Sequence, residues 1–95
     1  MPKWLQSGRR RDMCVLLAGT ENGELGGQRL KTRLESRYDT RIEPQSFYGA
    51  LDALEDAGFV THRTEGITDK YSLTDAGRRR LREQYEWMGE QLDDE

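Results

Sequence analysis

The sequence predicts one small domain of the α+β class that is mainly α-helical. Its length of 95 residues leaves room for a single hydrophobic core. Apolar residues recur every three to four positions in four separate stretches, and after Gly58 the period changes to about two. We therefore expect residues 1–95 to form one domain, with a core over residues 7–73 and an added helix over residues 74–92.

The first helix is expected from Arg9 to Ala18. Its apolar residues follow the helical period and are Met13, Leu16 and Leu17. Residues 20–27 are rich in turn-forming side chains and leave room for a very short strand around Glu24 and Leu25. This segment links the first helix to the second.

Two amphipathic helices follow, joined by a turn of a few residues. One runs from Gln28 to Tyr38, and the next begins at Pro44, where the missing amide hydrogen costs nothing, and ends at Gly58. One face of each helix is apolar: Leu30, Leu34 and Tyr38 in the first, and Phe47, Leu51 and Leu54 in the second. This arrangement is typical of a helix-turn-helix.

The region after Gly58 predicts a β-hairpin. Residues 59–63 and 70–73 are short runs of β-prone side chains, and residues 64–69 between them form a polar, turn-like segment. Three helices followed by a hairpin and a further helix are the order of a winged helix-turn-helix domain. We expect the wing over residues 59–73.

A final helix is expected from Asp75 to about Leu92, with Thr74 as its N-cap. Its apolar residues are spaced four, three and four apart, as in a coiled-coil seam: Leu81, Tyr85, Met88 and Leu92. Because no other segment remains to cover this stripe, we expect a C-terminal dimerisation helix. Trp4 and Leu5 add apolar surface at the other end of the chain and are expected at the same interface.

Three stretches resemble the PadR-like family of winged-helix transcriptional regulators. They are residues 44–51 (PQSFYGAL), residues 54–60 (LEDAGFV) and residues 70–77 (KYSLTDAG). The resemblance runs from about Met13 to Leu81. It implies a small member of the family with one dimerisation helix. Such a protein is expected to bind a pseudo-palindromic operator in double-stranded DNA as a homodimer and to regulate transcription.

The helix over residues 44–57 is the expected recognition helix. Its N-terminal half, turned away from the apolar face, would enter the major groove. Gln45 can pair with adenine N6 and N7, and Ser46 can bond a base or a phosphate. The Tyr48 hydroxyl can reach a phosphate, and Gly49 would let the backbone come close.

Further DNA contacts are expected from side chains around this helix. They are Thr40 and Arg41 in the preceding turn, Arg63 and Lys70 in the wing, and Arg10 and Arg11 in the first helix. Cations in the first turn of a helix oppose its dipole, so Arg10 and Arg11 are expected beside phosphate. A solvated position or an ion pair between subunits is the alternative for these two.

The charge balance supports an alternative function. The net charge is -3 at pH 7, with 18 acidic residues, whereas DNA-binding domains are usually basic. A winged-helix module that binds another protein and does not read DNA therefore remains an alternative function.

The basic residues include few lysines. The lysines are only Lys3, Lys31 and Lys70, and the other basic residues are arginines. This composition resembles that of proteins from salt-loving cells or from a high-GC genome.

The use of cysteine and histidine argues against catalysis. Cys14 is the only cysteine and His62 the only histidine, so the chain has too few of these residues for the usual metal sites and catalytic triads. We expect Cys14 in the core and His62 at a half-buried strand position.

The sequence shows no apolar run of membrane-spanning length and no cleavable leader. We therefore expect a cytoplasmic protein with no cofactor, no metal and no catalytic residues.

Overall fold

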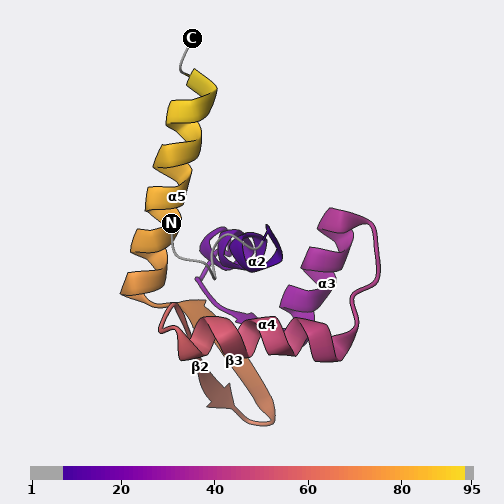
Figure 1. The fold of residues 1–95 in the computed structure, drawn as a ribbon. Helices are drawn as coiled ribbons and strands as arrows, with labels where there is room; N and C mark the ends of the chain where they lie inside the picture. Colours follow the sequence, from indigo (N-terminus) through magenta and orange to yellow (C-terminus); the bar gives the residue numbers. More distant parts are fainter. Residues whose placement is uncertain (1–7, 94–95) are drawn as a thin grey trace.

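A hairpin and a long C-terminal helix extend in opposite directions from a core of three helices (Figure 1). The computed structural model describes residues 8–93. In chain order its elements are α2 (Gly8–Ala18), β1 (Leu25–Gly26), α3 (Gly27–Tyr38), α4 (Pro44–Asp56), β2 (Val60–Glu65), β3 (Thr68–Leu73) and α5 (Asp75–Asp93). This is the winged helix-turn-helix order that the sequence predicts.

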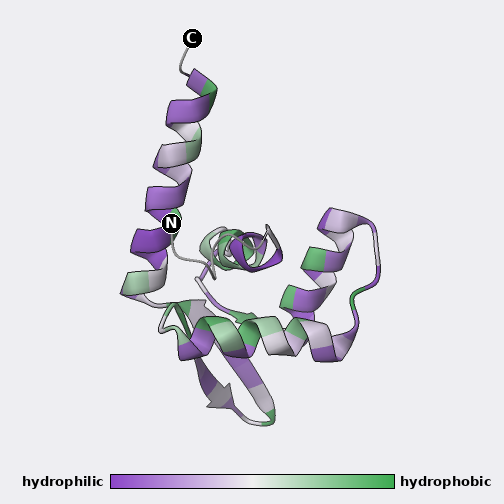
Figure 2. Cartoon of the chain, viewed as in Figure 1, coloured by the Kyte–Doolittle hydropathy of each residue, from purple (hydrophilic) through white to green (hydrophobic). Residues whose placement is uncertain are grey.

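The core lies where α2, α3 and α4 face one another (Figure 2). Its most deeply buried side chains include Met13, Leu17, Leu30, Leu34, Ile42, Phe47, Leu51 and Leu54. Apart from Ile42, these are positions that the helical period predicts. Cys14 lies among them, as expected, and burial raises the pKa of its thiol to about 12. The thiol therefore stays protonated and unreactive at neutral pH.

The sheet is antiparallel with the strand order β1-β3-β2. The hairpin strands are longer than predicted, because Glu65 pairs with Thr68 and only Gly66 and Ile67 remain in the turn. Gly66 has a φ of 64°, which suits the first central position of a type II′ turn. The sequence pattern missed the outer part of the hairpin because only Val60 of β2 is buried, so no apolar alternation marks this strand.

The start of α5 is fixed to the base of the hairpin. The Thr74 hydroxyl accepts a hydrogen bond from the Gly77 amide at 3.0 Å, which confirms the expected N-cap. The same hydroxyl donates to the Gly58 carbonyl at 2.6 Å. A Cβ on Gly77 would lie 2.0 Å from the Phe59 carbonyl oxygen, so this position admits no side chain. The close approach therefore sets the direction in which α5 leaves the core.

Candidate nucleic-acid interface

The N-terminal half of α4 presents an exposed polar face. Gln45, Ser46 and Gly49 are all exposed, while Phe47 and Leu51 on the opposite side of the helix are buried in the core. A Cβ on Gly49 would meet no atom within 4 Å, so the helix surface is open there. Three of the four residues predicted on the recognition helix thus share one surface.

The fourth residue, Tyr48, lies at the edge of this face and packs inward. Its ring stands edge-on to Phe47, with the ring centroids 4.9 Å apart. A Cβ on Gly27 would come within 3.0 Å of the Tyr48 ring and 3.1 Å of its hydroxyl oxygen. Tyr48 packs α4 against the start of α3, with its hydroxyl near Gly27, and its expected phosphate contact stays a prediction.

The start of α4 has backbone amides that no side chain caps. Glu43 occupies the N-cap position but makes no side-chain capping hydrogen bond, and Pro44 has no amide hydrogen. The next amides belong to Gln45 and Ser46. Because these amides and the helix dipole both favour negative charge, the start of α4 suits a phosphate.

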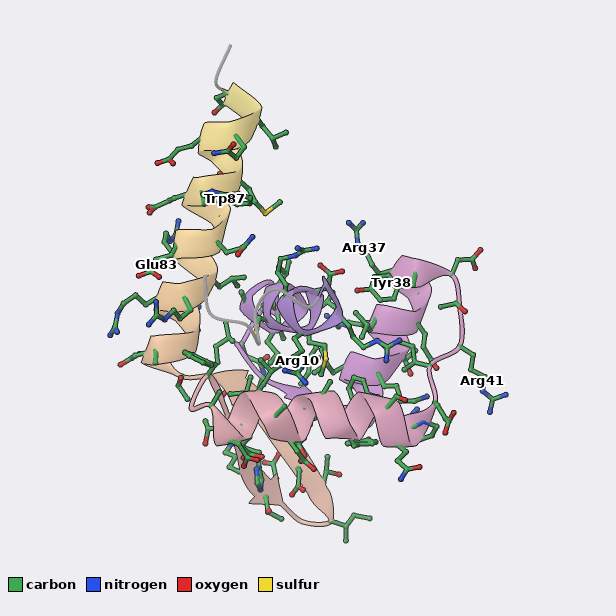
Figure 3. All side chains as sticks on the ribbon, in the orientation of Figure 1. Arg10, Arg37, Tyr38, Arg41, Glu83 and Trp87 are labelled. Carbon is green, nitrogen blue, oxygen red and sulfur yellow. The ribbon has the colours of Figure 1, made fainter. Side chains whose placement is uncertain are left out.

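The loop before α4 is held in place by Glu35. Its carboxylate accepts hydrogen bonds from the Ile42 amide at 2.8 Å and from Lys31 Nζ at 2.9 Å. These bonds lower the pKa of Glu35. Thr40 and Arg41 in this loop are exposed, and Arg41 points away from the core (Figure 3). An anchored loop therefore presents the two residues that were predicted to contact phosphate before α4.

Several charged side chains of the hairpin are paired within the protein. Arg63 donates to both carboxylate oxygens of Glu24, from Nε at 2.7 Å and from Nη2 at 2.8 Å, and lies 3.8 Å from Glu65. The pair raises the pKa of Arg63 and lowers that of Glu24. Thr64 donates to Asp69 at 2.8 Å. Arg63 was predicted to contact DNA, but its guanidinium is already occupied by carboxylates.

An ion pair ties β2 to the C-terminal half of α4. His62 Nδ1 pairs with the Glu55 carboxylate, and the His62 ring lies 5.4 Å from the Tyr71 ring between centroids. The hydrogen bond to Glu55 raises the pKa of His62, and the charges of Asp69 and Asp52 add to this effect. His62 was expected at a half-buried strand position, and it lies on the edge strand β2 with 38% of its side chain exposed.

The remaining predicted phosphate contacts come from α2 and β3. α2, which carries Arg10 and Arg11, lies on the side of α4 opposite the projecting hairpin (Figure 1). Both are half-buried, and Arg11 Nε lies 3.6 Å from an oxygen of Asp12. Lys70 is half-buried in the middle strand, opposite Gly26. The phosphate contacts expected of these three cations therefore stay predictions.

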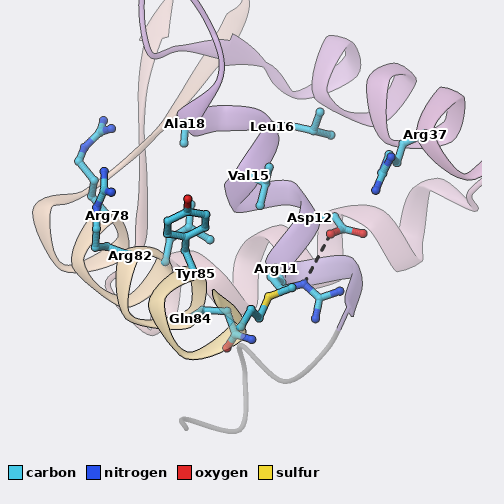
Figure 4. Close-up of a pocket in the computed structure, with 12 residues that line it drawn as sticks. Arg11, Asp12, Val15, Leu16, Ala18, Arg37, Arg78, Arg82, Gln84 and Tyr85 are labelled. Atoms are coloured by element: carbon cyan, nitrogen blue, oxygen red, sulfur yellow. Dashed lines mark ion pairs between the residues drawn. The ribbon is translucent and has the colours of Figure 1, made fainter. Parts of the chain in front are cut away.

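A second exposed surface lies on α5. Leu81 packs against the core, but the large apolar side chains beyond it are exposed: Tyr85 by 68%, Trp87 by 51%, Met88 by 38% and Leu92 by 77%. A groove of about 810 Å³ lies between α5 and α2 (Figure 4). Four arginines line it: Arg11, Arg37, Arg78 and Arg82. Trp4 and Leu5, predicted at the same interface, lie outside the described residues.

Two other kinds of feature are absent from residues 8–93. This part of the chain has no group of three or more histidine, cysteine, aspartate or glutamate side chains that could hold a metal ion. It also has no helix that is both long and apolar enough to cross a membrane.

Solved structures similar to this chain include RosR and two winged-helix proteins. RosR of H. salinarum has a TM-score of 0.85 at 21% identity, over 94% of this chain and 79% of RosR. The homodimeric winged helix-turn-helix DNA-binding domain of Mb0332 from Mycobacterium bovis has a TM-score of 0.79 at 24% identity, over 98% of this chain and 79% of that domain. F93 from STIV, a winged-helix DNA-binding protein, has a TM-score of 0.69 at 18% identity, over 95% of this chain and 94% of F93. These similarities show the fold.

The family comparison is more specific. The model of the transcriptional regulator PadR-like family matches residues 16–83, which include α4, the hairpin and the first turns of α5. A comparison with curated proteins gives no match. The matched family consists of transcriptional regulators and not of enzymes, as the sequence led us to expect. The match extends over more than half of the chain, and the chain therefore belongs to the PadR-like family of transcriptional regulators.

Proposed function

We propose that the protein is a homodimer that binds a pseudo-palindromic operator and regulates transcription there. One observation supports this proposal above the others: α4 and the hairpin lie on one side of the core, and α5 extends on the other side (Figure 1). α4 would enter the major groove, and the hairpin would touch the adjacent backbone or minor groove. Two units joined through α5 would meet half-sites one helical turn apart, roughly 34 Å, or a multiple of it.

Residues on and before α4 would make the principal DNA contacts. Gln45 would pair with adenine, and Ser46 would bond a base or a phosphate. Gly49 would let the helix backbone approach the groove. Thr40 and Arg41, together with the uncapped start of α4, would hold phosphates and fix the position of the helix. The exposure of all five residues supports these roles.

The exposed stripe on α5 would form the dimer interface. Tyr85, Met88 and Leu92 have coiled-coil spacing and expose apolar surface that a second copy would bury.

Charge complementarity supports the same partner. The groove between α2 and α5 is lined by four arginines, while the distal half of α5 carries acidic side chains. Those that are described are Glu86, Glu90 and Asp93. A partner helix laid along the groove would bring opposite charges together across a twofold axis.

Selection from a random pool of double-stranded DNA tests the proposal. The wild-type protein should enrich a sequence with two inverted half-sites, and sedimentation of the complex should show two protein chains per duplex. Enrichment of a single unrepeated site, or one chain per duplex, would contradict the dimeric operator complex.

A protein-interaction module is the second candidate. The net charge of -3 and the acidic second half of α4, with Asp52, Glu55 and Asp56, favour it. If selection enriches no sequence and the affinity for random DNA equals that for every selected clone, this candidate replaces operator binding.

A further inference from the structure

The tip of the hairpin carries a fully exposed apolar side chain. Ile67 has a relative exposure of 104%, above that of every other exposed large apolar residue in the described part of the chain. It follows Gly66 in a two-residue turn, where asparagine, aspartate or serine is usual. Isoleucine departs from this preference of the turn, and its side chain makes no packing contact that would stabilise the protein. Positions of this kind are often functional.

The charges around the tip disfavour an ionic contact with DNA. The guanidinium of Arg63 is held by Glu24, and Glu65 and Asp69 add negative charge on either side of the turn. Phosphates placed beside these two carboxylates would be repelled. An approach led by Ile67 would instead put an apolar side chain into a groove of the duplex.

The paired strands of the hairpin hold this tip away from the core. Six residue pairs join β2 to β3, from Val60 with Leu73 to Glu65 with Thr68. The hairpin projects past α4 on the side away from α2 and α3 (Figure 1). The tip would therefore lie beside, and not within, the stretch of DNA that α4 reads.

We propose that Ile67 enters the minor groove next to each half-site as an apolar wedge and selects base steps that unstack readily. This inference rests on the proposed operator binding. An inserted isoleucine partly unstacks a step and widens the groove, and the cost is smallest at pyrimidine–purine steps such as TA and CA. The hairpin would thus add specificity through the deformability of DNA, with no hydrogen bond to a base edge.

Fluorescence anisotropy with two operators tests the wedge. One is the selected operator, and the other replaces the pyrimidine–purine step beside the half-site by a stiff A-tract. Ile67→Ser keeps a residue that suits the turn, and Ile67→Val is the matched control that keeps a branched apolar side chain. The thermal unfolding temperatures of both variants should equal that of the wild type, because the Ile67 side chain makes no packing contact.

The wild type and Ile67→Val should bind the selected operator about tenfold more tightly than the A-tract operator, as expected for partial burial of one isoleucine. Ile67→Ser should bind both operators within about twofold of each other. 2-Aminopurine placed at the step should brighten with the wild type and stay dark with Ile67→Ser. If Ile67→Ser binds both operators as the wild type does, the wedge is overturned while operator binding stands. If the wild type selects no operator, both proposals fail.

Discussion

The two exposed surfaces of this protein are built from different kinds of side chain. On the surface of α4, the exposed residues are small or polar, as Gln45 and Ser46 show, and the hairpin charges beside it are largely paired within the protein. On α5, Tyr85 and Leu92 are exposed by 68% and 77%. The first surface suits a hydrated, polar partner such as DNA, and the second suits an apolar partner such as another copy of the chain.

The largest expected effect comes from removing the apolar character of α5. Met88→Glu combined with Leu92→Glu should give monomers, because four carboxylates would face each other across the twofold axis. Loss of the second half-site contact should weaken binding to the full operator at least about 100-fold. Leu81 is left unchanged because it packs against the core. Sedimentation velocity and fluorescence anisotropy measure the two effects.

Gln91→Glu is the matched control for this double change, since Gln91 is exposed on the same turns of α5. It should leave the dimer intact. Dimers that persist after the double change would show that α5 is not the interface.

On α4, the expected effect is a loss of specificity. Gln45→Ala should cost about 1 to 3 kcal/mol on the selected operator and much less on random DNA, because a bidentate contact to adenine is lost. Gln91→Ala is the matched control for Gln45→Ala. An equal loss on both DNAs after Gln45→Ala would remove this residue from base recognition.

The Arg41 side chain is expected to give a different result. Arg41→Ala should weaken binding by a similar factor on every sequence, because a phosphate contact positions the protein without reading bases.

The fold could be predicted because its main signals are local. Helical periodicity located α2, α3, α4 and α5, and the spacing of their apolar residues identified most of the core. The exposed positions of Gln45, Ser46 and Gly49 followed from the same spacing. These features depend on residues within a few turns of one another, which a sequence pattern records directly.

Long-range contacts could not be predicted in this way. The pairing of Arg63 with Glu24 joins residues 39 positions apart, and nothing in either segment marks it. The close approach of Gly77 to Phe59 depends on how α5 meets the hairpin. The packing of Tyr48 against the start of α3 was likewise not predicted, because this contact joins two helices and the pattern of neither helix records it.

The salt dependence of binding should show how the acidic surface meets DNA. Glu43 at the start of α4 and Glu65 and Asp69 in the hairpin lie at the proposed interface. Potassium chloride at about 1 M shortens the Debye length to about 3 Å and should screen their repulsion of phosphate. We expect a plot of log affinity against log salt to have a shallow or positive slope up to molar concentration. A steep negative slope would indicate ordinary counterion release and would contradict adaptation to high salt.

The smallest expected effect concerns pH and the pair of His62 with Glu55. Because the pair raises the pKa of His62 above its ordinary value of 6.5, the stabilisation is fully present below about that pH. It should disappear as the pH rises through the raised pKa. His62→Gln should therefore flatten the fall in unfolding free energy from slightly acid to slightly alkaline pH, measured by urea denaturation. The effect should be small, since 38% of the side chain is exposed. An unchanged pH profile would show that the pair does not contribute to stability.

On the proposed function, DNA binds the surface of α4 and the hairpin, while α5 forms the dimer interface. Titration of the ¹⁵N-labelled protein with its selected operator, followed by backbone amide chemical shifts, distinguishes these two surfaces. The largest shifts should fall on Gln45, Ser46 and the turn of Gly66 and Ile67, while the amides of the distal half of α5 should move little. Shifts concentrated along the groove between α2 and α5, with the start of α4 unchanged, would contradict the account.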